Sequence, residues 1–504
     1  MAHWKRTAAA AGLVCAIGAQ PGWAEVTASQ VWDDWKSYMQ GFGYTITGTE
    51  ARSGDTLLVT GITMAIEIPE GGGSVSVGIP ELSFTDNGDG TVDIGVPAVL
   101  PMSVSGVADT GEAFDGTVNY TTTGFSMTAS GDPEDLTYTY SAAAMAMTLA
   151  SLTVDGEDAS DFVDVTVEMA GVLGRSAMAV GEMRAYDQTL RADGVTYTMR
   201  VTDPEAGGNA LFTGTYSDLM FEGVGEMPLV IDPQSMASGM LEGFALESAF
   251  SHQGSRVEFN VVDEGQTVTG AFSSAAGSLA VAFGAESLAY GVSSTGLSVN
   301  MAGGDLPLPV ELSISELGFD LLMPVGSSEE EQDFALGITL IDFATADMLW
   351  SMFDPAGVLP RDPATVVLDI AGKGRLNVDI MNPEAMAAFT GDMPGELNSL
   401  TLNDLVVSVA GAELTGTGDF VFDNSDLQTF DGFPRPVGSV KLNLNGANGL
   451  IDKLIQMGLL PQEQAMGARM MMGMLAVPVG DDQLQSTIEI NEQGHVLANG
   501  QRLQ

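Results

Sequence analysis

Residues 195–202 read Val-Thr-Tyr-Thr-Met-Arg-Val-Thr, a strict alternation of apolar and polar side chains. Because successive side chains of a β-strand point to opposite faces, this period of two predicts a strand with one apolar face and one face in water. The same period recurs at 136–141, 256–261, 297–301, 310–314 and 440–444. Such strands are typical of antiparallel sheets, so we expect an all-β protein with a few short helices. Val195, Tyr197 and Val201 should lie on the buried side.

Short turns rich in Asp, Asn and Gly separate the predicted strands. Residues 86–90, Asp-Asn-Gly-Asp-Gly, give the clearest hairpin tip. Asp193-Gly194, Glu264-Gly265 and Gln493-Gly494 resemble it. The architecture that we favour is one or two long, strongly curved antiparallel sheets that form an apolar groove. Sandwich-like lobes are the alternative.

The first residues have the pattern of a secretory signal peptide. Lys5 and Arg6 precede a small and apolar run at 7–17, which is too short to span a bilayer. Gly22 and Ala24 place small residues before a predicted cleavage site at Glu25. The one cysteine of the chain, Cys15, lies inside this segment, so the exported protein would contain no disulfide. We therefore expect a signal peptide over 1–24 and a periplasmic protein, with the extracellular space as the alternative.

Helical patterns suggest how the rest of the chain is organised. We expect an N-terminal helix plus an antiparallel β lobe over 25–231, a connecting helix over 232–243 that begins at Asp232-Pro233, and a C-terminal β lobe over 244–504. Within the C-terminal lobe, helix-turn repeats are predicted near 345–363 and 447–475, each with a glycine stop and a Leu-Pro turn. A further short helix should begin at Asn382-Pro383.

The N-terminal helix carries an aromatic stripe. Thr27 and Gln30 have the spacing of a capping box. Apolar side chains then fall on one helical face: Val31, Trp32, Trp35, Tyr38 and Met39. Such a stripe is usually part of a core, and docking onto a membrane or a partner is the alternative.

The chain is strongly acidic without having the composition of a disordered protein. Its formal net charge is −50, and removal of Lys5 and Arg6 with the signal peptide would make it −52. Such a chain repels nucleic acid, so we expect no nucleic-acid partner. Its hydrophobic fraction of 45% is too high for disorder. The acid excess indicates solubility, with calcium binding as the alternative, although residues 86–93 have glycine where an EF-hand loop needs Asp or Asn.

The sequence contains no recognisable catalytic motif. After the signal peptide only His252 and His495 remain, far apart and outside any ligand-spaced cluster, so we expect both at the surface. There is no nucleophile elbow, and Gly372-Lys373 lacks the spacing of a phosphate loop. We therefore predict a non-enzymatic protein with no catalytic, metal or cofactor residues and no cofactor. A hydrolase that uses two carboxylates is the minor alternative.

The most informative chemical feature is methionine. The chain has 28 methionines, and flexible, polarizable side chains of this kind suit adaptable apolar binding surfaces. Met466, Met470 and Met474 form a helical stripe that should face the concave side of the sheet and be partly exposed, or else be ordinary core. The leading hypothesis is a protein of the cell envelope that binds a lipid or another apolar ligand. The alternative is a structural or scaffolding protein with a packed interior, whose partners would be other envelope proteins. Candidate ligand contacts are Met466, Met470, Met471, Met474, Trp350 and Phe353.

Several motifs resemble a domain-of-unknown-function family of exported proteins from Gram-negative bacteria. They are Trp-Ser-Met-Phe-Asp-Pro at 350–355, Leu-Pro-Arg-Asp-Pro-Ala-Thr at 359–365, the Trp32-x-x-Trp35 helix with 41–44, and the close at 491–500. This resemblance spans nearly the whole exported chain and implies no known activity. The one-faced strands and the Gly-Leu-Leu-Pro turn are more distantly similar to AsmA-like envelope proteins. Those are long β-grooves thought to hold acyl chains; we expect the present chain, with a cleaved signal peptide, to lack their N-terminal membrane anchor.

Overall fold

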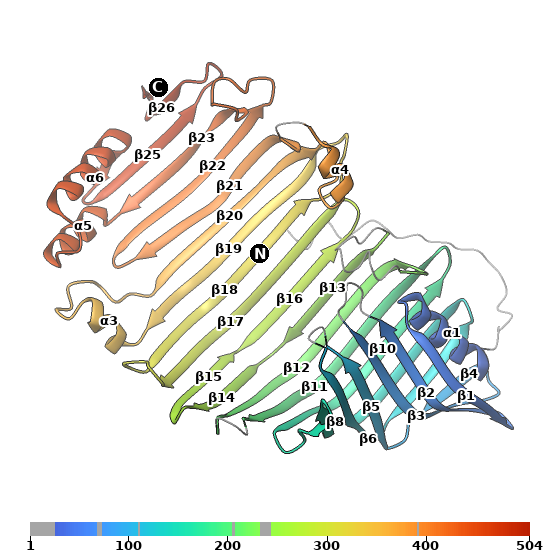
Figure 1. The fold of residues 1–504 in the computed structure, drawn as a ribbon. Coiled ribbons are helices and arrows are strands. Elements are labelled where there is room, and N and C mark those ends of the chain that lie inside the picture. Colours follow the sequence, from blue (N-terminus) through green and yellow to red (C-terminus); the bar gives the residue numbers. More distant parts are fainter. Residues whose placement is uncertain are drawn as a thin grey trace.

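The computed structural model describes residues 26–67, 73–108, 111–203, 207–231, 243–390 and 393–503. Among these residues the chain forms one antiparallel sheet of 27 strands with five helices (Figure 1). The predicted fold class, all-β with a few short helices, is confirmed. The predicted signal peptide and most of the predicted connecting helix lie outside the described residues.

The strands before residue 231 form the N-terminal part of the sheet. They are β1 Thr45–Ser53, β2 Thr56–Glu67, β3 Ser74–Asp86, β4 Thr91–Gly95, β5 Val99–Val107, β6 Ala113–Thr123, β7 Ser126–Asp132, β8 Asp135–Val154, β9 Glu157–Asp158, β10 Val163–Val180, β11 Met183–Thr202 and β12 Asn209–Pro228.

The strands after residue 243 continue the same sheet. They are β13 Ala245–His252, β14 Ser255–Asp263, β15 Gln266–Ser274, β16 Ala276–Phe283, β17 Ser287–Gly303, β18 Val310–Pro324, β19 Gln332–Thr345, β20 Ala364–Leu376, β21 Gly395–Val409, β22 Ala412–Asp423, β23 Arg435–Asn445, β24 Val477–Gly480, β25 Gln483–Ile490, β26 Val496–Ala498 and β27 Gln501–Arg502. The helices are α1 Ala28–Gly41, α3 Asp347–Phe353, α4 Pro383–Ala388, α5 Ala447–Gln456 and α6 Gln462–Leu475.

The sheet is a meander in which most strands pair with their neighbours in the chain. At four places a pair of short strands lies end to end and takes the position of one long strand: β4 with β5, β6 with β7, β13 with β14, and β15 with β16. Strands β13 and β14 both pair with β12, and they pair in turn with β16 and β15, which both pair with β17. Because β12 and β13 are direct neighbours, the hydrogen bonding of the sheet continues across the predicted boundary at 232–243.

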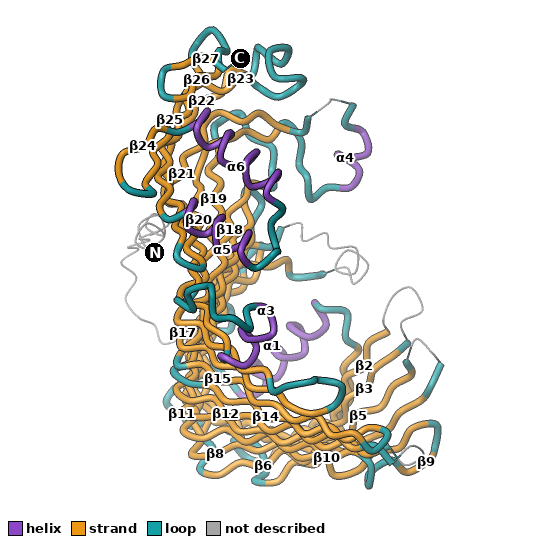
Figure 2. The backbone as a smooth tube through the Cα atoms, turned by 90° about the vertical axis from the view of Figure 1, so that its left-hand side faces the viewer, coloured by secondary structure: helices purple, strands orange, loops and turns teal. Residues whose placement is uncertain are grey.

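The sheet is strongly curved, as predicted. Figure 2 shows it edge-on: the C-terminal strands form a tall wall, and the N-terminal strands curl back so that α1 lies in the hollow. The helices α3, α5 and α6 lie on the same side of the wall as α1. We call this side the inner face and the opposite side the outer face.

A row of residues with left-handed backbone crosses the sheet near the middle of its strands. Gly61, Gly124, Gly171, Asp218, Gly296 and Asp342 have φ between 49° and 61° and lie in β2, after β6, and in β10, β12, β17 and β19. The strand pairing mostly keeps its register across the row, but the alternation of side chains restarts there. On β10, Met169 and Val172 both pack on the inner face although they are three residues apart.

The row of left-handed residues explains why the turn predicted at Asp193-Gly194 is wrong. Asp193-Gly194 was predicted as a hairpin tip, but the two residues lie in the middle of β11. There Asp193 is opposite Gly171, whose left-handed backbone resets the alternation. Val195, Tyr197 and Val201 follow the reset and are half-buried on the inner face, so that part of the prediction is confirmed.

Close packing is concentrated at the N-terminal end of the sheet. Val31 and Trp32 of α1 are buried against Val59, Phe84 and Val92 of β2, β3 and β4. Edge-on and tilted aromatic contacts join Trp35 and Trp32 to Phe84. The Thr27 amide donates to Gln30 Oε1 at 2.9 Å, so the predicted helix start with its capping pair is confirmed. None of the described helices is long and apolar enough to cross a membrane.

Candidate functional site

The inner face carries a continuous band of apolar side chains, which the strand register makes visible. Across four neighbouring strands Met145 pairs with Met169, which pairs with Val195, which pairs with Tyr216. Paired residues share a face, and Met145 and Met169 pack beside Tyr140 near α1. The apolar band therefore runs from the packed N-terminal end into the open C-terminal wall.

On the wall this band is not covered. Its large side chains keep 36–40% of their surface exposed on consecutive strands, namely Phe272, Leu279, Tyr290, Val292, Leu317 and Ile338. The rings pack sideways within the single layer: Phe259 lies 5.9 Å from Phe272 and 6.2 Å from Phe212, centroid to centroid. A contiguous exposed apolar surface of this kind usually marks an interaction site.

His252 belongs to this apolar face, which corrects the prediction of a surface histidine. The residue is 8% exposed, and its ring lies 5.3 Å from the Tyr216 ring and beside Phe250, centroid to centroid. Burial lowers the pKa of His252 below its ordinary value, although its Nδ1 accepts a hydrogen bond from the Gly254 amide at 3.3 Å. At neutral pH the ring is therefore uncharged, in keeping with the rest of the face.

A cavity of about 350 Å³ lies beneath α1, between the helix and the curled part of the sheet. The second half of α1 forms its roof with Trp35, Tyr38 and Met39. The floor consists of side chains from β1 to β10, nearly all apolar: Ile46, Ile62, Met64, Ile79, Leu82, Met127, Tyr138, Tyr140, Ser176 and Met178. Its volume lies at the lower end of the range for small-molecule sites.

A buried ion pair closes one side of this cavity. Arg184 Nη1 lies 2.9 Å from Asp34 Oδ1, and both side chains are nearly inaccessible. The Tyr138 hydroxyl donates to Asp34 Oδ2 at 3.0 Å, and burial raises the pKa of Tyr138 far above its usual value. The Arg184 guanidinium also lies over the Tyr38 ring at 5.1 Å. Arg184 thus balances the charge of the Asp34 carboxylate, and Tyr138 hydrogen-bonds to it within the cavity wall.

Further hydroxyls lie in the cavity wall, among them those of Ser176 and Tyr140. The Ser176 hydroxyl is buried and has no hydrogen-bond partner, although Ser176 pairs directly with Tyr138 across β8 and β10. Burial raises the pKa of the Tyr140 hydroxyl, which therefore stays protonated at neutral pH. A buried polar group without a partner is uncommon in native structures and calls for an explanation.

The predicted ligand contacts lie on two helices, α3 and α6, at the same end of the strands. Strands β19 and β23 run in the same direction and finish on that side of the sheet, and α3 follows β19 while α5 and α6 follow β23 (Figure 1). Phe353 of α3 is 73% exposed and Trp350 is half-buried. On α6, Ala465 is buried, whereas Met466, Met470, Met471 and Met474 are 56–71% exposed. The methionine stripe is therefore not ordinary core, and whether it contacts a ligand stays a prediction.

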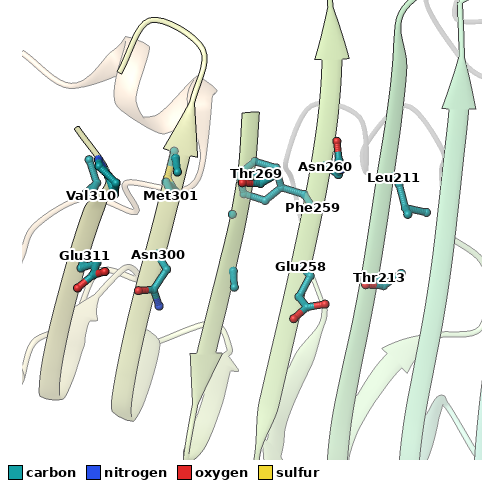
Figure 3. A pocket seen from close by; sticks show the side chains of 14 residues that line it. Leu211, Thr213, Glu258, Phe259, Asn260, Thr269, Asn300, Met301, Val310 and Glu311 are labelled. Atoms are coloured by element: carbon teal, nitrogen blue, oxygen red, sulfur yellow. The ribbon is translucent and has the colours of Figure 1, made fainter. Parts of the chain in front are cut away.

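The outer face has a different chemical character. Figure 3 looks into a hollow of about 480 Å³ lined by Thr213, Glu258, Asn260, Asn300 and Glu311, among others, on β12, β14, β15, β17 and β18. The two carboxylates are three strand positions apart, or about 14 Å at the usual strand spacing. Paired carboxylates of glycoside hydrolases are about 5–10 Å apart, so Glu258 and Glu311 do not form such a pair.

The cavity beneath α1 was not predicted from the sequence as a site. Its signal was the aromatic stripe of the N-terminal helix, which we assigned to the core, with docking as the alternative. Only the first half of that stripe is core, because the second half overhangs the cavity. Among the described residues no group of three or more His, Cys, Asp or Glu side chains is placed to hold a metal ion.

Comparison with known proteins gives one match. Residues 250–500, about half of the chain, match the model of a family described as uncharacterized protein conserved in bacteria, DUF2125. No curated protein and no solved structure matches the chain. The similarity to AsmA-like envelope proteins is not shown by these comparisons.

Proposed function

We propose that this chain, which belongs through residues 250–500 to the uncharacterised DUF2125 family, is a non-enzymatic envelope protein that binds a lipid or another apolar molecule on its inner face. The predicted signal peptide supports a periplasmic location. The observation that carries the proposal is the uncovered apolar band on the wall.

The physical reason is that the inner face leaves apolar side chains exposed to water. Leu279, Val292 and Leu317 each leave more than a third of their surface in water, although they belong to one contiguous band. Apolar surface gains about 25 cal/mol per Å² when it is removed from water. An acyl chain that lies along the band would provide this burial without requiring any polar partner.

The alternative is a structural or scaffolding protein with a packed interior. The packed clusters support it only at the N-terminal end, because the buried apolar residues described on β13–β19 are few and include no large cluster. A scaffold would need a protein partner to cover the wall. A lipid ligand would cover it without one.

The experiment is native mass spectrometry of the protein purified from its own envelope. We expect additional mass that extraction with organic solvent identifies as lipid. A Val292→Asp, Leu317→Asp variant places charges on the inner face and should lose this mass. A Val224→Asp variant is the matched control, because Val224 is 46% exposed on the outer face. Lipid-free wild-type protein, or equal loss in the control, would reject the proposal.

A further inference from the structure

We propose that the cavity beneath α1 binds one neutral single-chain amphiphile that carries a hydrogen-bonding oxygen, such as a long-chain alcohol or a monoacylglycerol. This inference rests on the proposed function, because the cavity is continuous with the inner face through Tyr140, which lines the cavity and packs against Ala142 and Val172 beyond it. It goes further by naming a site and a chemical class of ligand.

The cavity beneath α1 is large, and its lining is apolar. Protein interiors are close-packed, and voids larger than a water molecule are few. An engineered apolar cavity of about 150 Å³ stays dry and binds small apolar molecules. The cavity beneath α1 has more than twice that volume and an almost entirely apolar lining. An apolar group is therefore a better occupant than water.

Hydrogen bonds at both ends of α1 hold the helix above the cavity. At its first turn the Ala28 amide donates to Asp86 Oδ1 at 2.6 Å, and Trp32 Nε1 donates to Glu50 Oε1 at 2.8 Å. At its last residue the Gly41 carbonyl accepts a hydrogen bond from the Ile231 amide at 2.7 Å. Both ends of the roof are thus fixed, and Trp35, Tyr38 and Met39 span the space between them.

Among the described residues that line the cavity, Asp34 is the one with an acidic or basic side chain, and its carboxylate already has Arg184 and Tyr138 as partners. A fatty-acid carboxylate would be buried beside Asp34 with no free cation in the described lining, which is strongly unfavourable. A cationic headgroup would have to break the Asp34–Arg184 pair. The ligand that fits is therefore uncharged.

The Ser176 hydroxyl lies in the wall of the cavity, buried and without a hydrogen-bond partner. An ester, hydroxyl or ether oxygen of the ligand would accept or donate the missing hydrogen bond. A pure hydrocarbon would leave this group unsatisfied.

Tryptophan fluorescence of the exported protein tests the inference. The chain has five tryptophans, of which Trp4 and Trp23 lie in the predicted signal peptide, and replacement of Trp350 by Phe then leaves Trp32 and Trp35 at the cavity. The probe is a monoacylglycerol with a dibrominated chain, whose bromine atoms quench nearby indoles. We expect saturable quenching, and at least tenfold weaker quenching by the fatty acid with the same brominated chain.

Substitutions at Ser176 locate the binding site. Ser176→Ala should weaken monoacylglycerol binding about three- to tenfold, the usual effect of one hydrogen bond, and leave binding of a brominated alkane unchanged. Ser176→Phe should fill the cavity and abolish quenching. Ser294→Ala, which removes a hydroxyl from the inner face at β17, is the matched control and should change nothing.

The outcomes separate this inference from the proposed function. Lipid bound in native mass spectrometry without quenching of Trp32 and Trp35 would overturn the cavity site and leave the proposed function standing. Equal quenching by the fatty acid, or no effect of either Ser176 variant, would overturn the ligand class. Absence of bound lipid together with absence of quenching would overturn both.

Discussion

Single residues reset the alternation of side chains across this sheet. A left-handed backbone is inexpensive for glycine and tolerated by aspartate, and these are the two residue types in the row that crosses the strands. Each such position shifts the alternation of side chains by one residue while the strand pairing mostly keeps its register. The apolar band consequently stays on the inner face although its sequence period shifts by one residue.

Gly171 offers a direct test of this role. Its φ is 61°, and a Cβ there would meet the Asp193 carboxylate. We expect Gly171→Ala to destabilise the protein by about 1–3 kcal/mol, measured by denaturant unfolding. Gly194→Ala is the matched control, because Gly194 has no left-handed φ and its nearest neighbour would be 3.4 Å away. Equal effects of the two substitutions would contradict the assigned role of the row.

At the scale of the elements, the docking of α1 onto the sheet depends on the charge of Glu50, which changes with pH. Glu50 Oε1 accepts hydrogen bonds from Lys36 Nζ at 2.9 Å and Trp32 Nε1 at 2.8 Å, and the Lys36 ammonium holds the pKa of Glu50 below its ordinary value. A carboxyl with a lowered folded-state pKa stabilises the fold above its unfolded pKa of about 4.3 and loses that contribution as the pH falls through the folded value. Solvent screening limits the effect to about 1 kcal/mol or less.

We therefore predict that α1 loosens as the pH falls below about 4.3, which would appear as a red shift of the Trp32 and Trp35 emission. Glu50→Gln keeps the acceptor oxygen but removes the titration. Its emission should change less over the same pH range. An identical pH profile in both proteins would show that other carboxyls control the docking of α1.

Substitutions in α6 test whether its exposed methionines are needed for folding. Met470 and Met474 are 71% and 59% exposed, so replacing both with Asp should change the free energy of unfolding by only about 1 kcal/mol or less. Ala465→Asp on the same helix is the contrasting variant, since it would bury an unpaired charge at a side chain that is 1% exposed. Thermal melts compare the two. A collapse in the methionine variant would mean that the stripe is core and would remove it as a ligand contact.

Sequence periodicity predicted the elements better than it predicted the site. Alternation at 195–202 identified a strand and its buried side, and Thr27 with Gln30 identified the start of α1. The mid-strand reset at Asp193 was missed, because Asp-Gly in a strand has the same local signature as a hairpin turn. The cavity was missed for a different reason. A helical stripe specifies which side chains face the sheet, but the gap beneath Trp35 and Tyr38 depends on how far the sheet curls.

At the scale of the whole molecule, an apolar inner face is combined with a net charge of −50. A surface with that charge is repelled by anionic bilayers over about one Debye length, roughly 10 Å at 0.1 M salt. The proposed uptake of a neutral lipid requires close approach to a membrane. The charge should therefore control the rate of uptake, whereas the inner face controls the affinity.

The resulting prediction concerns vesicle composition. Lipid-free protein should take up fluorescent monoacylglycerol faster from zwitterionic phosphatidylcholine vesicles than from vesicles with added phosphatidylglycerol. The difference should shrink as salt rises to about 1 M, where the Debye length is about 3 Å. The amount bound at equilibrium per protein should be similar at both salt concentrations, because burial of apolar surface depends only weakly on screening. Faster uptake from the anionic vesicles at low salt would mean that a local basic surface, rather than the net charge, directs the approach to the membrane.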